Sequence, residues 1–177
     1  MSKDGKLMEM LTGYAASHQH PFNVFVHMIG IPTIMLGVLI PLTWAGIEIG
    51  GITLNLAHLV MLGFFFFYLT LDTIFAITFL VFALLVAQLA GIIGAQPAAV
   101  SGAVAAAAFF GGYAAQFIGH AVEKSMPVLV KHPIQANLAA PFFQIVEMFK
   151  IFGLRNELFD AVQAQIEARR QQESAAC

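Results

Sequence analysis

The stretch from residue 74 to residue 94, IFAITFLVFALLVAQLAGIIG, decides the fold of this chain. It carries no charged residue, and a helix needs about 20 apolar residues to cross the hydrocarbon core of a membrane. The flanking sequence has the same character, because residues 7–123 contain no lysine or arginine and only four acidic residues. A water-soluble domain could not cover its surface with so few charges. We therefore predict that lipid surrounds the middle of the chain.

Three further apolar runs lie on either side of this stretch, and 59% of all residues are hydrophobic. The runs cover residues 22–45, 52–71 and 98–122, so that the chain has four predicted spans. Short turns separate them at residues 46–51, at Asp72 and at Gln96-Pro97. The predicted fold class is all-α: a polytopic membrane protein with four transmembrane helices.

The pattern changes after Lys124, where prolines and lysines interrupt the apolar residues. We expect residues 127–153 to form interfacial or re-entrant helices that complete a single membrane domain, residues 1–153. Residues 154–177 are predicted to be a polar helix and tail. The net charge of −2 and the absence of a basic cluster larger than Arg169-Arg170 indicate no nucleic-acid partner. The sequence leaves the oligomeric state open.

The positive charges orient the predicted spans. All eight lysines and arginines lie before residue 7 or after residue 123, and such residues are enriched in the cytoplasmic segments of membrane proteins. Both termini are therefore expected in the cytoplasm, which requires an even number of crossings. We predict an integral protein of a bacterial inner membrane, with the Asp72 turn on the cytoplasmic side.

This topology gathers polar residues from three segments at one membrane depth. They lie at the cytoplasmic ends of spans one, two and four: His18, His20, Asn23 and His27; Asp72; and Gln116, His120 and Glu123. Ionisable residues near lipid are costly and usually functional. Histidine and carboxylate are also the ligands that zinc and non-haem iron prefer. The cluster indicates a metal site, and the alternative is an interhelical hydrogen-bond network without metal.

Helical spacing supports two shared faces within this cluster. One face carries Gln116, His120 and Glu123, and the other carries His20, Asn23 and His27. His18 is out of phase with His27 in an unbroken helix. Pro21 is a natural first-turn proline, so His18 can lie on a preceding segment that does not share this phase.

Two of the polar residues have simple structural interpretations as well. Asp72 could cap the third helix instead of serving the site. His58 lies near the other end of span two, and we interpret it as a packed or hydrogen-bonded residue outside the site.

Four blocks of sequence resemble a small membrane family whose fungal member is the endoplasmic-reticulum 2-hydroxy fatty acid dioxygenase. The opening block of that family is similar to His18-Gln-His-Pro-Phe-Asn23-Val-Phe-Val-His27-Met-Ile-Gly-Ile-Pro32. Its later blocks are similar to Tyr68-Leu-Thr-Leu-Asp72, to Gln116-Phe-Ile-Gly-His120-Ala-Val-Glu123-Lys-Ser-Met-Pro127, and to Ala140-Pro-Phe-Phe143 with Glu147. The resemblance runs from about residue 14 to residue 153.

The resemblance implies an Fe(II)-dependent dioxygenase that converts 2-hydroxy fatty acids and O₂ into carbon dioxide and the acid one carbon shorter. It implies His18, His27 and His120 as iron ligands. His20 is a further candidate ligand, although bacterial relatives commonly carry asparagine there. We expect four residues to act beside the metal, with the two carboxylates orienting the histidine rings: Asn23, Asp72, Gln116 and Glu123.

The substrate chemistry agrees with this assignment. An α-hydroxy carboxylate can chelate iron through two oxygens, and three protein ligands would leave a position for O₂. The acyl tail would then lie between the spans, in contact with membrane lipid. Two other functions stay open at this point: a zinc-dependent membrane lipid hydrolase, and a non-catalytic protein that binds lipid or ions.

Overall fold

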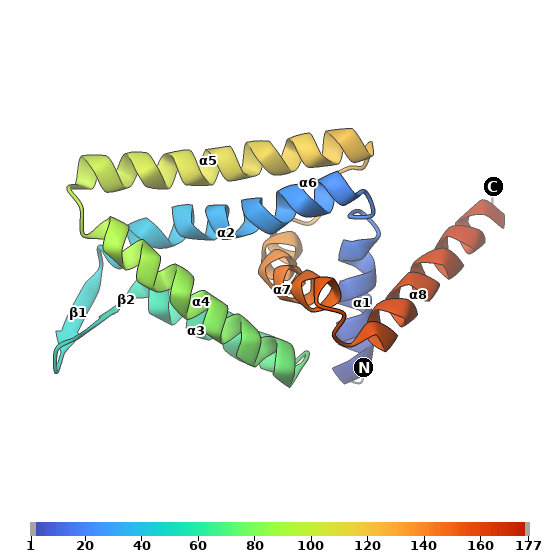
Figure 1. Ribbon diagram of the computed structural model, residues 1–177, viewed down its shortest axis with the longest axis horizontal. Coiled ribbons are helices and arrows are strands. Elements are labelled where there is room, and N and C mark those ends of the chain that lie inside the picture. The colour runs from blue at the N-terminus through green and yellow to red at the C-terminus, as the bar shows by residue number, and fades with distance from the viewer. Residues whose placement is uncertain (1–2, 176–177) are drawn as a thin grey trace.

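The computed structural model describes residues 3–175, and most of them are helical (Figure 1). The helices are α1 (Lys3–Ala15), α2 (Pro21–Thr43), α3 (Leu56–Leu69), α4 (Thr73–Gly94), α5 (Ala98–Glu123), α6 (Val128–Lys131), α7 (Pro133–Ile151) and α8 (Asn156–Ala175). Two short strands, β1 (Gly46–Ile49) and β2 (Ile52–Asn55), form an antiparallel hairpin between α2 and α3.

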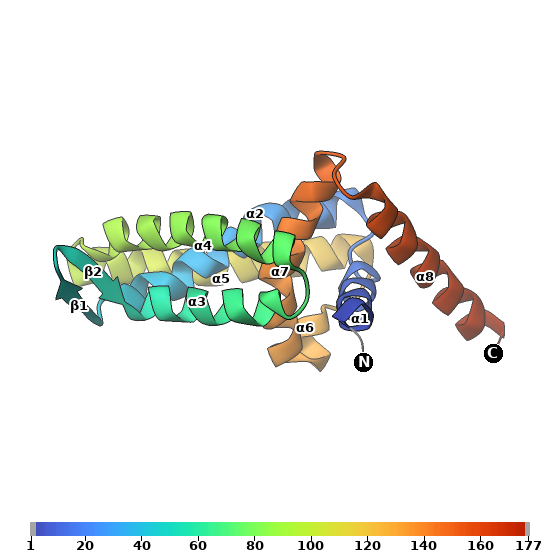
Figure 2. The same cartoon turned by 90° about the horizontal axis from the view of Figure 1, so that it is seen from below.

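Three helices, α2, α4 and α5, are long and apolar enough to cross a membrane. Helix α2 lies between the other two and packs closely along α5 (Figures 1 and 2). Helix α3 is also apolar but has only 14 residues, which correspond to about 21 Å of helix. It packs against α4 as an antiparallel neighbour.

The hairpin corrects the prediction for the second span. Residues 52–71 were expected to be one helix and residues 46–51 a turn, but residues 52–55 pair with β1. Gly50 and Gly51 form the two-residue turn with φ of 58° and 80°, which suits a hairpin with both turn residues in the left-handed region. Asn55 then caps α3 by accepting a hydrogen bond from the backbone N–H of His58. The all-α prediction therefore holds except at this hairpin.

A seam of small residues holds α2 against α5. Gly30 and Gly37 of α2 face Gly112 and Ala105 of α5, while Gly119 faces the side chain of Asn23. Each helix thus offers a small or buried polar residue at every seventh position, and the two series run in opposite directions. A Cβ added to Gly37 would lie 2.6 Å from the backbone nitrogen of Phe109. Such close backbone approach supplies the packing energy that associates helices in lipid.

Helix α7 lies across one end of the spans rather than along them (Figures 1 and 2). Its buried face carries Phe142, Phe143, Ile145 and Val146. Two hydrogen bonds fix it: Gln144 Nε2 donates to the carbonyl of Met28 at 3.1 Å, and the Tyr68 hydroxyl donates to that of Leu138 at 2.8 Å. The first bond satisfies a carbonyl that Pro32, which has no N–H, leaves free in α2.

The first and last helices pack on each other at the same end of the molecule. Leu11 of α1 and Val162 and Ile166 of α8 are buried in the common core, and the hydroxyl of Thr12 donates to Gln165 Oε1 at 2.8 Å. The predicted polar tail is therefore helical as far as Ala175, and the two residues beyond it lie outside the described part of the chain.

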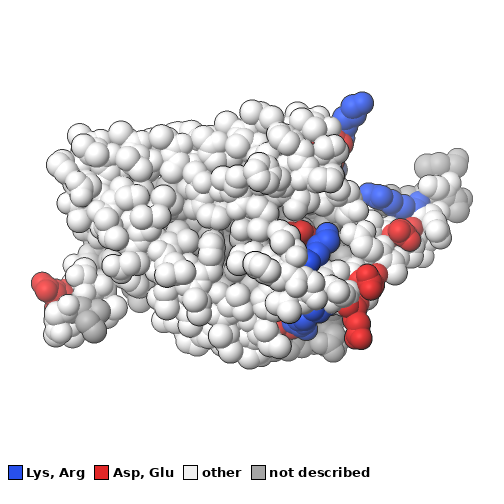
Figure 3. Space-filling model, viewed as in Figure 1, with Lys and Arg blue, Asp and Glu red and all other residues white. Residues whose placement is uncertain are grey.

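The surface separates into an apolar body and a charged end. The charged side chains on the face drawn in Figure 3 gather at the end of the molecule that carries α1, α7, α8 and the C-terminal end of α5, apart from a small acidic patch at the hairpin. Large apolar side chains on the outer faces of the spans are exposed, such as Leu85 at 67% and Phe110 at 70%. A continuous apolar surface of this kind marks a membrane-associated protein.

Candidate metal centre

Three histidines from separate segments meet near the charged end of the bundle. His18 lies in the loop between α1 and α2, His27 lies in α2, and His120 lies in the last turns of α5. Their ring centroids are 4.4, 4.8 and 4.9 Å apart, and the rings stand nearly perpendicular to one another. Each offers a ring nitrogen within 4.8 Å of the others, and all three residues are at least 96% buried.

Hydrogen bonds orient the three rings. Nδ1 of His18 donates to the carbonyl of Tyr14 at 2.8 Å, and Nδ1 of His27 donates to the carbonyl of Asn23 at 2.9 Å. Because a carbonyl can only accept, both Nδ1 atoms carry the proton and both Nε2 atoms keep a lone pair. Nδ1 of His120 lies 2.9 Å from the hydroxyl of Ser125. Such partners fix ring orientation and tautomer at metal sites.

The surroundings of His18 keep its ring neutral. Burial, together with the neighbouring His27, lowers its pKa to about 3. Its ring stacks on that of Tyr14, with centroids 4.1 Å apart. Nε2 of His18 is buried and has no hydrogen-bond partner among the described residues. A buried nitrogen lone pair beside two other imidazoles fits a divalent metal ion, so these three residues could hold one.

A polar network surrounds the triad. The Nδ2 group of Asn23 lies 2.5 Å from Oε2 of Glu123, 3.2 Å from the carbonyl of Ser17 and 3.5 Å from Nδ1 of His120. The other carboxylate oxygen of Glu123 accepts the backbone N–H of Gln19 at 2.8 Å. Glu123 therefore joins the loop that carries His18 to the helix that carries His120. Its oxygens do not belong to the group of clustered ligand atoms found in the described chain.

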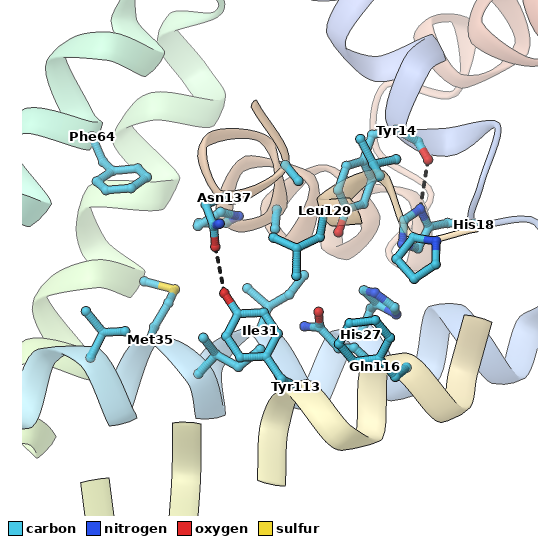
Figure 4. Close-up of a pocket in the computed structure, with 18 of the residues that line it drawn as sticks. Tyr14, His18, His27, Ile31, Met35, Phe64, Tyr113, Gln116, Leu129 and Asn137 are labelled. Carbon is cyan, nitrogen blue, oxygen red and sulfur yellow. Dashed lines mark hydrogen bonds between the residues drawn. The ribbon is translucent and has the colours of Figure 1, made fainter. Parts of the chain in front are cut away.

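An apolar cavity of about 220 Å³ opens beside the three rings (Figure 4). His18, His27 and Gln116 lie toward one end of it, and Met35 and Phe64 lie toward the other. The lining continues along α2 as far as Leu39, twelve residues beyond His27, or about 18 Å. The amide Nε2 of Gln116 is buried without a hydrogen-bond partner in the part of the chain described. The site thus combines three candidate metal ligands, a free amide donor and an apolar chamber.

Two predicted site residues lie elsewhere. His20 is exposed and caps α2, where its Nδ1 accepts the backbone N–H of Phe22 at 3.2 Å. Asp72 caps α4 by accepting from Ile74 and Phe75, and it pairs with Arg155 at 2.7 Å. Burial alone would raise the pKa of Asp72, but these hydrogen bonds and the Arg155 charge lower it overall.

Neither residue lines the cavity. The structure therefore does not bring His20 and Asp72 to the three histidines. Each side chain caps the start of a helix, which is the alternative that the sequence left open for Asp72. His58 caps α3 and is also outside the site, as the sequence indicated.

Several residues of the site escaped the sequence interpretation. Tyr14 supports His18 from one helical turn earlier, and Ser125 supports His120 from the loop after α5. Tyr113 and Asn137 line the cavity and share a hydrogen bond of 2.8 Å. The polar segment of residues 3–15 was not predicted to be helical. A helix there would have indicated that the carbonyl of Tyr14, one turn earlier, can reach the ring of His18. No pattern links Tyr113 to Asn137, since they meet only through the fold.

Comparison with known families gives one match. The family described as 2-hydroxy-palmitic acid dioxygenase Mpo1-like matches residues 5–151, which include most of α1, all of α2 to α7 and all three histidines. No curated protein and no solved structure matches the chain. The long match agrees with the four sequence blocks and with the clustered histidines. The chain therefore belongs to the 2-hydroxy-palmitic acid dioxygenase Mpo1-like family.

Proposed function

We propose that this protein is an Fe(II)-dependent dioxygenase of 2-hydroxy fatty acids, embedded in the membrane that holds its substrate. The observation that carries the proposal is the buried triad of His18, His27 and His120 at the end of an apolar chamber. The family name supports the same substrate class and reaction. The balanced reaction consumes one 2-hydroxy acid and one O₂, and it releases carbon dioxide, water and the acid one carbon shorter.

Iron supplies the redox chemistry with O₂ that no side chain of the cavity can perform. The protein contributes three neutral imidazoles, which suit Fe(II) and leave further coordination positions open. The Nδ1 atoms of His18 and His27 already donate to the carbonyls of Tyr14 and Asn23, so these two rings present Nε2 without reorganisation, and Nδ1 of His120 faces the hydroxyl of Ser125. Preorganised ligands of this kind hold a metal in one geometry.

The chamber fits a single acyl chain. Its walls away from the histidines are aliphatic and aromatic, with Ile31, Met35, Leu39, Met61 and Phe64 among them. An apolar tail placed there would leave the carboxylate and the 2-hydroxyl near the three rings. Gln116 is poised to donate its free amide N–H to one of these oxygens.

Glu123 and Asn23 are proposed to act through the histidines rather than as ligands. The Asn23 amide reaches both Glu123 and the His120 ring, and its backbone carbonyl accepts from His27. Asn23 thus fixes two of the three rings, and Glu123 fixes Asn23. Outer partners of this kind typically change metal affinity or activity about 10–100-fold.

We further propose that α3 is a fourth helix that crosses the membrane and that both termini face the cytoplasm of a bacterial cell. Helix α3 joins the far end of α2 to the start of α4, and the hairpin β1–β2 extends it at that far end. Lysines and arginines lie only before α2 and after α5 in the sequence, which agrees with this orientation. The triad then lies at the cytoplasmic boundary.

The activity is tested with purified protein loaded anaerobically with Fe(II) and then given 2-hydroxypalmitate and air. We expect uptake of O₂, release of CO₂ and formation of pentadecanoate in equal amounts. A zinc-loaded sample serves as the control and should consume no O₂. Ester hydrolysis by the zinc-loaded protein without any O₂ uptake would instead favour a lipid hydrolase. Absence of both metal binding and turnover would favour a non-catalytic lipid-binding protein.

A further inference from the structure

A second groove lies on the other side of α7 from the metal cavity. It has a volume of about 620 Å³ and is bounded by α1, the C-terminal end of α3 and the α6–α7 segment. Its apolar floor includes Met10, Phe67, Leu71 and Leu138. It shares no lining residue with the metal cavity, so the proposed oxidation does not account for it.

The rim of the groove is positively charged. Lys6 of α1 and Lys131 of α6 both line it and are exposed, and His132 follows directly. Neither lysine pairs with a carboxylate that the structure describes. Glu9 is the one acidic residue in the lining. With His132 neutral, the groove carries a net charge of about +1, and a ligand with one negative charge would balance it.

The groove also lies at the boundary between the apolar body and the charged end. Phe66 and Phe67 of α3 are exposed on the apolar side, whereas Lys6 and Lys131 belong to the charged end. Val130 and Ile134 are exposed beside Lys131, at 58% and 78%. Exposed lysines beside exposed apolar side chains are typical of segments that lie in the headgroup layer of a membrane.

We propose that this groove binds the headgroup of one anionic phospholipid, with its phosphate between Lys6 and Lys131 and an acyl chain over Phe67 and Leu71. Ammonium groups are strong partners for phosphate. The elongated apolar floor matches an acyl chain that continues into the bilayer. Because Gln135 and Leu138 face this groove while Ala136 and Asn137 face the metal cavity, the lipid would brace the wall that the two spaces share.

The test uses native mass spectrometry to measure which defined lipids the detergent-purified protein retains, and how tightly. The protein is titrated with phosphatidylglycerol and phosphatidylcholine in separate samples. We expect one tightly held phosphatidylglycerol and weaker binding of phosphatidylcholine. Lys6→Gln and Lys131→Gln should each weaken phosphatidylglycerol about fivefold, and Glu9→Gln should strengthen it because a repelling charge is removed.

The matched control is Lys124→Gln, which removes an exposed lysine outside the groove. It should bind phosphatidylglycerol like the unchanged protein, and the iron content of every variant checks that the fold is intact. Equal retention of phosphatidylglycerol and phosphatidylcholine would overturn the proposal. So would unchanged binding of phosphatidylglycerol by the Lys6→Gln, Lys131→Gln double variant.

Discussion

At the scale of single residues, the account depends on the Nε2 atoms of three histidines, which have no hydrogen-bond partner in the described part of the chain. Replacing His18, His27 or His120 by alanine removes one of the three proposed ligands. Each variant is expected to lose nearly all bound iron and all activity. Iron is measured by elemental analysis of protein loaded with one equivalent of Fe(II). A variant that keeps both iron and full activity would remove its residue from the ligand set.

Two other histidines supply matched controls. His58→Ala loses part of the α3 cap, at a cost of about 1 kcal/mol of stability, but should bind iron normally. His20→Asn should keep iron, activity and stability, because asparagine caps a helix as well as histidine does. Loss of iron in His20→Asn would show that His20 reaches the metal, contrary to its exposed position.

Variants of Glu123 and Asp72 distinguish a residue that supports the proposed ligands from a residue that only caps a helix. Glu123→Gln should keep its iron but turn over about 10–100-fold more slowly, since the support for Asn23 and His120 is weakened. Asp72→Asn should keep both iron and turnover, because it loses only the pair with Arg155 while asparagine still caps α4. Iron stoichiometry and product formation are measured together. A folded Glu123→Gln protein without iron would make Glu123 a ligand and displace one histidine.

Most of the site could be predicted from residue types and topology. Positive charge at both ends of the sequence placed His18, His27 and His120 on one face of the membrane, and helical spacing put Gln116 and Glu123 beside His120. The side chains of His20 and Asp72 lie outside the cluster for a common physical reason, and the cap was one of the two interpretations open for Asp72. Each precedes a helix whose first N–H groups lack partners. The side chain therefore accepts hydrogen bonds from that helix and does not turn toward the distant cluster.

At the scale of helices, the small-residue seam sets the distance between His27 and His120. Gly37→Ala puts a methyl group against the backbone of Phe109 and Ala105, where no side chain can move away. We expect a loss of about 1–3 kcal/mol, seen as a lower midpoint of thermal unfolding in detergent. The shift of α2 against α5 should also weaken iron binding.

Gly111→Ala is the control for this seam, because a Cβ at Gly111 meets nothing within 4 Å. It should leave unfolding unchanged or raise its midpoint slightly, since alanine favours a helix more than glycine does. If Gly37→Ala and Gly111→Ala proved equally stable, the seam would not determine the packing of α2 and α5.

Helices α2, α4 and α5 were largely predictable, because long apolar runs define them in the sequence, although Pro32 and Pro41 interrupt the run of α2. The hairpin was not, since Ile52, Thr53 and Leu54 are apolar or β-branched and extend the run of α3 in the sequence. Only the pairing with β1 and the cap at Asn55 decide that they form a strand. The segment that forms α5 is rich in glycine and alanine, but the helix that these small residues meet followed only from the fold.

At the scale of the whole molecule, the orientation can be measured without activity. Cys177 is replaced by serine, and single cysteines are introduced as Glu48→Cys in the hairpin and Ser174→Cys in α8. In intact spheroplasts an impermeant thiol reagent should label only the first, and the second should react only after the membrane is opened. The reverse pattern would place the triad on the outer side of the membrane.

The central claim is that three imidazoles of this chain bind iron, and X-ray absorption at the iron edge tests it most directly. Protein loaded with one equivalent of Fe(II) should show a first shell of nitrogen and oxygen at about 2.0–2.2 Å and outer-shell scattering from three imidazole rings. The His18→Ala, His27→Ala, His120→Ala triple variant should show none. A spectrum without imidazole scattering, or one that the triple variant reproduces, would contradict the account.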